Sequence, residues 1–269
     1  MNYIPLDLTD LAIASVLVLV NGALSLALRL GVAKQLLIAS VRMVVQLVLV
    51  GFVLTALFSV ISPWWTGLAA LAMVLFAGRE ILARQERRML GGWTFGLGTG
   101  CMLVAASLVT IFALTTAVNP EPWYHPRWAL PLLGMILGNT MTGISLGLHT
   151  LTTGLVRERN GVEAQLALGA TRQEALRPVA TAAMRSALMP IIISMAATGL
   201  VALPGMMTGQ ILAGVDPADA VRYQILIMFL IAGGTTVGAI AAVVGAGLRL
   251  TDSRHRLRLD RLSAAREGA

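Results

Sequence analysis

Two sequence patterns suggest catalysis, and the residues around them argue against it. The run Gly143-Ile144-Ser145-Leu146-Gly147 matches the G-x-S-x-G pattern of serine hydrolases, with His149 four residues after the serine. That pattern needs a turn between a strand and a helix to expose its serine, whereas here it lies inside a long apolar run. The single lysine, Lys34, is followed by glutamine, so the Gly-Lys-Ser/Thr of a Walker A loop is missing. We therefore expect no catalytic residue and no ATP hydrolysis in this chain.

Metal binding is the next chemistry to consider. The three histidines, His125, His149 and His255, are scattered, and Cys101 is the only cysteine. A site for ferric or ferrous iron would need clustered carboxylates or imidazoles, and the apolar runs supply no such cluster. Two methionines at 206–207 could offer thioethers to a soft metal, although methionine also fills irregular apolar gaps. We expect no resident metal and no cofactor in this chain.

Composition indicates a membrane protein. Of 269 residues, 57% are hydrophobic and 12% are charged, whereas a soluble protein carries about 25% charged residues. Seven apolar runs, each of about 18–26 residues, are long enough to cross a bilayer as helices. The runs cover 8–28, 35–58, 64–83, 94–117, 129–151, 186–203 and 223–248. We expect an all-α bundle of about seven transmembrane helices, one transmembrane domain over 1–269, in the inner or plasma membrane of the cell.

Basic residues set the expected orientation. Seventeen of the 20 Lys and Arg residues lie in the segments 29–34, 79–93, 152–185 and 249–269. Cytoplasmic loops are enriched in positive charge, so we expect the N-terminus outside and the C-terminus in the cytoplasm. Asp7 precedes the first run and Asp10 lies at its start, where a signal peptide would carry basic residues. The net charge of +7 then reflects topology and anionic lipid rather than nucleic acid, and the tail 249–269 is expected to be solvated or to touch lipid.

Polar side chains inside the apolar runs are candidates for a substrate path. Arg42 and Gln46 share one helix face, and a charge within a span usually faces the bundle interior or a water-filled path. A structural ion pair between Arg42 and Glu80 is the alternative, because both lie near the inner ends of their runs. The other candidates are Asn139, Thr140, Met206, Met207 and Gln210. Interhelical hydrogen bonds explain Asn139 and Thr140 equally well.

Proline and glycine mark two further features. Pro204-Gly205 ends the sixth run, and a short helix over 208–213 is expected to stop at Gly214 before Asp216-Pro217 opens the next helix. Irregular backbone at membrane depth lines a cavity or is buried in protein, so we expect an outer gate or a re-entrant turn here. Glycine pairs four residues apart predict close helix packing. These pairs are Gly96 and Gly100, Gly134 and Gly138, Gly143 and Gly147, and Gly234 and Gly238.

The segment 152–185, between the fifth and sixth runs, predicts two helices joined by a tight turn. Residues 162–168 favour a short helix, and Gly169 can take the left-handed conformation that ends one. Thr171 and Glu174 form a capping box that starts a second helix, and Pro178 kinks or restarts that helix on its way to the sixth run. Force applied to the short helix would then reach the sixth run, although an ordinary capped turn has the same local signals.

Glu163-Ala164, with Gly169 five residues after the alanine, resembles the EAA loop of ABC-transporter permeases, although Gln165 replaces the second alanine and the later Leu-Pro is absent. Larger blocks resemble the FetB permease family, in the order in which the family has them. These blocks are 42–51, 133–139, 163–171, 203–214 and 223–232, of which Pro-Gly-Met-Met-Thr-Gly-Gln at 204–210 is the most specific.

The family comprises membrane subunits of ABC transporters that pair with a separate ATPase and are linked to iron export, and its plant relatives are linked to aluminium tolerance. The resemblance implies a permease homodimer with two ATPase subunits, which bind ATP and Mg, docked on the 162–176 loops. The implied docking residues are Glu163, Ala164, Leu166, Leu168, Gly169, Ala170, Thr171, Arg172 and Glu174. With no cage of carboxylates in the runs, we expect iron to pass weakly held or chelated.

The alternative function is an ion-coupled secondary transporter. Such a transporter needs a coupling group within the membrane, and the acidic residues inside the runs are Asp10, at the outer start of the first, and Glu80, at the inner end of the third. Seven runs also do not divide into two inverted halves. Transport that survives a proton uncoupler while ATP is maintained would exclude this alternative.

Overall fold

The computed structural model describes residues 7–252 and 254–264, apart from the side chain of Leu8. The helices are α1 (Leu8–Ala27), α2 (Ala33–Ser59), α3 (Pro63–Ala83), α4 (Trp93–Phe112), the π-helical η1 (Ala113–Val118), α5 (Pro126–Arg157), α6 (Arg159–Ala167), α7 (Arg172–Ala197), α8 (Gly205–Leu212), α9 (Pro217–Arg249) and the 3-10 turn η2 (Leu259–Arg261). Seven helical segments within the described residues are long and apolar enough to cross a membrane: α1, α2, α3, α4 with η1, α5, α7 and α9. The predicted all-α, multi-pass fold is confirmed.

The chain divides into two compact units, residues 1–61 and 62–269. In the first unit, α1 and α2 pack against each other as a hairpin. The turn between them places Arg29 at φ 52° and Gly31 at φ 74°. Within this unit α2 packs against α1, and its other side chains are mostly apolar, as expected of a membrane-spanning helix.

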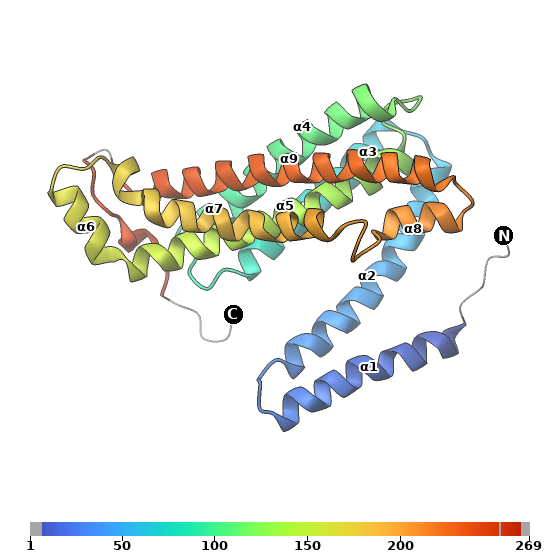
Figure 1. Cartoon of the computed structure of the whole chain (residues 1–269), viewed down its shortest axis with the longest axis horizontal. Coiled ribbons are helices and arrows are strands. Elements are labelled where there is room, and N and C mark those ends of the chain that lie inside the picture. The colour runs from blue at the N-terminus through green and yellow to red at the C-terminus, as the bar shows by residue number, and fades with distance from the viewer. Residues whose placement is uncertain (1–6, 253, 265–269) are drawn as a thin grey trace. The chain divides into compact units, whose positions relative to one another are not determined.

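The second unit is built around α5, which packs most extensively against α9 and α7 (Figure 1). Helix α4 contacts α3, α5 and α9, and α3 also lies against α5. Short α6 lies at one end of α5 and α7, and short α8 lies at the opposite end, beside α9. The arrangement leaves the loop between α6 and α7 at one end of the bundle.

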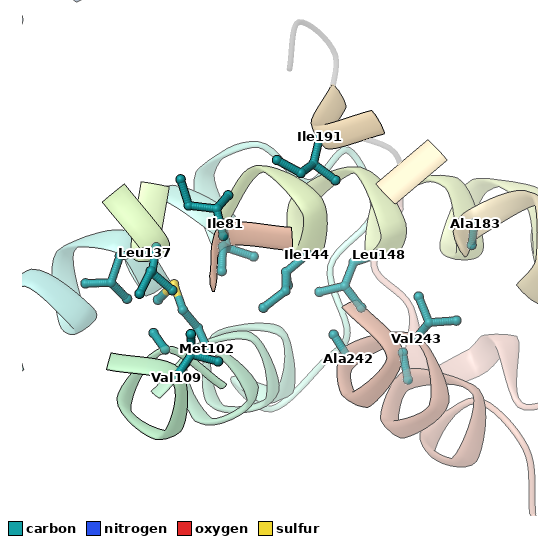
Figure 2. Packing of buried hydrophobic residues seen from close by; sticks show 14 of the residues in the cluster. Ile81, Met102, Val109, Leu137, Ile144, Leu148, Ala183, Ile191, Ala242 and Val243 are labelled. Carbon is teal, nitrogen blue, oxygen red and sulfur yellow. The ribbon is translucent and has the colours of Figure 1, made fainter. Parts of the chain in front are cut away.

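Apolar side chains of α4, α5, α7 and α9 fill the centre of this unit. Ile144 and Leu148 of α5 lie fully buried near Ala242 and Val243 of α9 (Figure 2). Met102 of α4 occupies the same cluster. Burial of these side chains against other helices distinguishes them from the lipid-facing residues, and it fixes which face of α5 points inward.

Glycines allow the closest helix approaches. A Cβ added to Gly143 of α5 would lie 2.7 Å from Cγ2 of Thr235, and one on Gly238 of α9 would lie 2.6 Å from Cγ2 of Thr140. A Cβ added at Gly147 or Gly234 would also lie close to side chains of neighbouring helices. Close helix packing is therefore confirmed for the pairs Gly143/Gly147 and Gly234/Gly238. Nothing in the described chain lies within 4 Å of a Cβ added at position 96, 100 or 138, so close packing at these glycines stays a prediction. Spacing creates a smooth helix face, but it does not determine whether another helix covers that face.

The structure also corrects the course of the sixth run. Helix α7 continues unbroken through Pro178 and Pro190, so Pro178 does not restart it, and it ends at Ala197 rather than near residue 203. The N–H that Pro178 lacks would have bonded to the carbonyl of Glu174. Both residues are exposed, so water can serve that carbonyl and the helix continues.

The tail after α9 packs back on the bundle, in contrast to the expected solvated or lipid-touching tail. Leu257, Leu259 and Leu262 lie against the hydrophobic core. The backbone N–H of Ser263 donates to the carbonyl of Arg88 (2.8 Å), and the N–H of Arg88 donates to Oγ of Ser263 (3.0 Å). Leucines separated by arginines give the tail one apolar face, and this face covers the turn between α3 and α4.

Candidate functional site

The turn between α6 and α7 is held by backbone hydrogen bonds that close the end of α6. Gly169 has φ 94°, a conformation that favours glycine. Its N–H donates to the carbonyl of Leu166 (3.1 Å), and the N–H of Ala170 donates to the carbonyl of Gln165 (3.0 Å). This pair of bonds is a Schellman motif, so the predicted stop at Gly169 is confirmed. Helix α6 itself begins at Arg159, three residues before the predicted start.

The capping box that starts α7 is also confirmed. Oγ1 of Thr171 accepts a hydrogen bond from the backbone N–H of Glu174 (3.4 Å), and Oε2 of Glu174 accepts one from the N–H of Thr171 (2.8 Å). The Thr171 hydroxyl also donates to the same carboxylate oxygen (2.7 Å). These reciprocal bonds satisfy N–H groups that a helix start otherwise leaves open. The turn therefore joins two well-defined helix ends with few residues between them.

Helix α6 is anchored on one side and open on the other. Val162 is buried, and Leu166 packs against the core. Ala164 is exposed, and Glu163 forms an ion pair with Arg159 (2.8 Å). Leu168, at the end of the helix, is 89% exposed.

A cavity of about 450 Å³ lies under α6, between α5 and α7. Its lining includes His149, Thr153, Gln165 and Val179. Nδ1 of His149 is buried there and has no hydrogen-bond partner within the described residues. Sequence reasoning left this histidine without a role, although its spacing from Thr153 already placed the two polar residues on one helix face.

The tail reaches the start of α7. Nδ1 of His255 accepts a hydrogen bond from the backbone N–H of Arg172 (3.0 Å). Oδ1 of Asp252 accepts bonds from the backbone N–H groups of Arg256 and Arg254, both at 2.9 Å. Together with the nearby arginine charges, these bonds hold the pKa of the Asp252 carboxyl below its usual value, the bond from Arg256 contributing most. The sequence did not predict the contact between His255 and Arg172, because no local signal links positions so far apart.

The predicted path residues of the second unit are not brought together. Thr140 is fully buried against the glycines of α9, whereas Asn139 is exposed and donates from Nδ2 to the carbonyl of Met135 in its own helix (2.9 Å). Met206 lines a cavity of about 320 Å³ that also includes Met135 and Tyr223. Gln210, elsewhere on α8, has a buried Oε1 without a partner among the described residues, and Met207 is half-buried beside Met206. Their role in a path stays a prediction.

Arg42 and Gln46 lie in α2, in the first unit, whereas Glu80 lies in α3, in the second. Glu80 forms an ion pair with Arg84 one turn further along α3 (3.6 Å). The pair of Arg42 with Glu80, and a path role for Arg42, stay predictions. Within residues 7–252 and 254–264, no three His, Cys, Asp or Glu side chains come together as a metal site.

The remaining sequence predictions concern α8 and the hydrolase pattern. Helix α8 begins at Gly205, earlier than expected, and the turn after it has Gly214 at φ 93°. Oδ1 of Asp216 accepts a hydrogen bond from the N–H of Ala218 (2.8 Å) and caps α9, as the Asp-Pro pair predicted. Ser145 is buried inside α5, without the exposed elbow that a nucleophilic serine needs.

The sequence profile of the family described as "Uncharacterised protein family (UPF0014)" matches residues 8–250. The chain is 39% identical over 217 residues to the UPF0014 membrane protein slr1647 of Synechocystis, covering 79% of this chain and 81% of that protein. It is 31% identical over 248 residues to the "Probable iron export permease protein FetB" of Escherichia coli, with 92% and 93% covered. It is 33% identical over 231 residues to the Protein ALUMINUM SENSITIVE 3 of Arabidopsis thaliana, with 86% and 82% covered. No solved structure matches the chain. The long match to the family profile and these relatives together show that the chain belongs to the UPF0014 family of multi-pass membrane proteins.

Proposed function

We propose that this chain is the permease subunit of an ABC transporter that exports iron, another metal or a metal chelate. A separate ATPase subunit would bind ATP and Mg and dock on the 162–176 loop. Two copies of each subunit would form the transporter, with the permease pair around a central path. The observation that carries the proposal is the joining of α6 to α7 through a closed glycine turn and a capping box.

This arrangement suits the transfer of motion. The Schellman motif and the capping box resist fraying at the two helix ends, so a push on α6 is passed on rather than absorbed in the turn. Helix α7 then runs unbroken to Ala197 and packs against α5 and α9. Closure of the two ATPase subunits would therefore tilt α7 within the bundle and alternate the opening of the path.

The names of two relatives support a metal cargo. One is the probable iron export permease protein FetB of Escherichia coli, and the other is the Protein ALUMINUM SENSITIVE 3 of Arabidopsis thaliana. Iron and aluminium ions favour oxygen-rich clusters, and the described residues bring together no such cluster. We infer that the cargo passes in a chelated form or is held only weakly. The side chains of Arg42 and Gln46 on α2 remain candidates for contact with an anionic chelate.

The experiment is a pull-down of the tagged chain from its native membrane, followed by assay for a bound ATPase. Gly169→Glu should lose the ATPase because φ 94° disfavours any side chain. Leu168→Glu should also lose it, because a charge replaces the exposed apolar tip. The matched controls are Gly214→Glu and Leu200→Glu, which alter a left-handed glycine and a 95% exposed leucine in the turns flanking α8, at the opposite end of the bundle.

Capture of an ATPase by the wild type and both controls, with loss in both loop variants, supports docking at the 162–176 loop. Capture that is equal in all five proteins places the docking site elsewhere. No ATPase with the wild type contradicts the ABC assignment itself and favours ion-driven transport.

A further inference from the structure

A groove of about 550 Å³ lies between α5, α7 and α9, next to the 162–176 loop. Most of its wall is apolar and includes Leu188 and Ile192 of α7 and Ile240 and Val244 of α9. Ile192, Ile240 and Val244 are also strongly exposed. The apolar wall of the groove is therefore continuous with the outward-facing surface of membrane-spanning helices.

Three arginines line the same groove: Arg172, Arg177 and Arg185. The groove has no Asp, Glu or Lys in its lining. Arg177 and Arg185 are exposed and form no ion pair with any residue of 7–252 or 254–264. The groove thus combines an apolar wall with positive charge that the described chain leaves without a counter-ion.

Arg185 lies at the inner edge of the predicted membrane span, at the last position before the sixth apolar run (186–203). A charge at the edge of the hydrocarbon region is best served by water or by an anionic lipid headgroup. Arg177 lies eight residues before Arg185, about 12 Å along α7, and both side chains line the groove. Arginine side chains are long enough for both guanidinium groups to contact one headgroup across this separation.

We infer that this groove binds an anionic phospholipid, with an acyl chain against α7 and α9 and the phosphate at Arg177 and Arg185. Basic pockets between membrane helices bind anionic lipid headgroups in this way. A second copy of the chain could fill the apolar wall, but it would also have to supply a carboxylate near the inner edge of the span. The carboxylate at the inner end of a predicted run, Glu80, already pairs with Arg84 (3.6 Å), and the other one inside a run, Asp10, lies at the outer end.

The test uses the full chain purified in detergent and compares retention of phosphatidylglycerol and phosphatidylcholine by native mass spectrometry. Wild type should retain one phosphatidylglycerol and lose phosphatidylcholine. Arg177→Gln/Arg185→Gln should weaken phosphatidylglycerol binding by about 30-fold, since each arginine near a membrane surface contributes about a factor of five. Arg29→Gln/Arg87→Gln removes the same charge outside the groove and should bind like wild type. Equal retention of the two lipids, or equal losses in the two double variants, overturns the assignment.

A second variant tests the apolar wall and keeps every charge. Val244→Trp should fill the groove and lower phosphatidylglycerol retention while the three arginines remain. It therefore tests lipid binding in the groove even where the double arginine variant does not fold. Phosphatidylglycerol should also raise the thermal midpoint of wild type but not of Val244→Trp, because a ligand stabilises only the state that binds it. Unchanged lipid retention in Val244→Trp, together with dissociation of a dimer, would assign the groove to a second copy and refute the lipid site.

Discussion

His255 and Arg172 join the C-terminal tail to the start of α7: the imidazole Nδ1 accepts the backbone N–H at 3.0 Å. In the same tail, the backbone N–H of Ser263 donates to the carbonyl of Arg88 in the turn between α3 and α4, and the N–H of Arg88 donates to Oγ of Ser263. One short segment thereby ties two distant turns together at the end of the bundle that carries the 162–176 loop. If the loop moves α7, the tail must move together with α7 or the hydrogen bond between His255 and Arg172 must break.

His255→Ala tests this contact. The substitution removes the acceptor, which contributes about 1 kcal/mol to the stability of the tail's attachment. Amide hydrogen exchange should become faster at residues 254–258 and at Arg172, and it should not change in α5. His125→Ala is the matched control, because Nδ1 of His125 accepts the N–H of Arg127 (3.3 Å) in the same way, at the start of α5. Equal exchange at the tail in wild type and His255→Ala would contradict the prediction.

The capping box gives a second prediction. Thr171→Ala removes the side-chain oxygen that accepts the N–H of Glu174, at a cost of about 1 kcal/mol. The first turn of α7 should fray, and ATP-driven transport should fall while the protein still inserts and folds. Thr171→Ser keeps the oxygen and should retain both the protected amides and transport. Transport by Thr171→Ala at the wild-type rate would show that the start of α7 need not be rigid for coupling.

The sequence predicted the features that local signals control. The left-handed Gly169, the Thr171–Glu174 box and the Asp216 cap each depend on residues within a few positions, and each is confirmed. Apolar length likewise predicted the seven spanning helices. The contact of His255 with Arg172 depends instead on how the tail folds back, which no spacing encodes.

The sequence likewise could not predict which residues of different helices lie next to each other. Arg177 and Arg185 looked like ordinary inner-side basic residues, and only the course of α7 beside α9 shows that they share one groove. Gly143 and Gly96 have the same spacing signal, yet one faces Thr235 and the other faces open space. The spacing of residues along the sequence identifies a helix face, whereas tertiary packing decides which helix covers that face.

These two glycines give a third prediction. Gly143→Ala places a methyl group 2.7 Å from Cγ2 of Thr235 and 3.2 Å from the backbone oxygen of Ala187, so α5 must shift from α7 and α9. Overpacking of this kind costs about 1–3 kcal/mol. The thermal midpoint in detergent should fall for Gly143→Ala and stay unchanged or rise slightly for Gly96→Ala, where no atom lies within 4 Å and alanine favours the helix over glycine. A larger loss for Gly96→Ala would indicate that α4 packs against a second chain there.

Arg42 gives the last prediction, which separates a path role from a structural one. As a path residue, Arg42 acts through its charge on an anionic cargo, so Arg42→Met should abolish transport while the folded protein still reaches the membrane in normal amount. As a partner of Glu80, it would instead help to offset a carboxylate near the inner end of α3, and its removal would leave Glu80 with the half-exposed Arg84 alone. Arg42→Met would then lower the yield of folded protein, and the exchange Arg42→Glu/Glu80→Arg would restore it. Fluorescence size-exclusion chromatography measures the fold, and uptake into inverted vesicles measures transport. Normal folding with transport lost supports the path, whereas recovery of folding in the exchanged variant supports the pair.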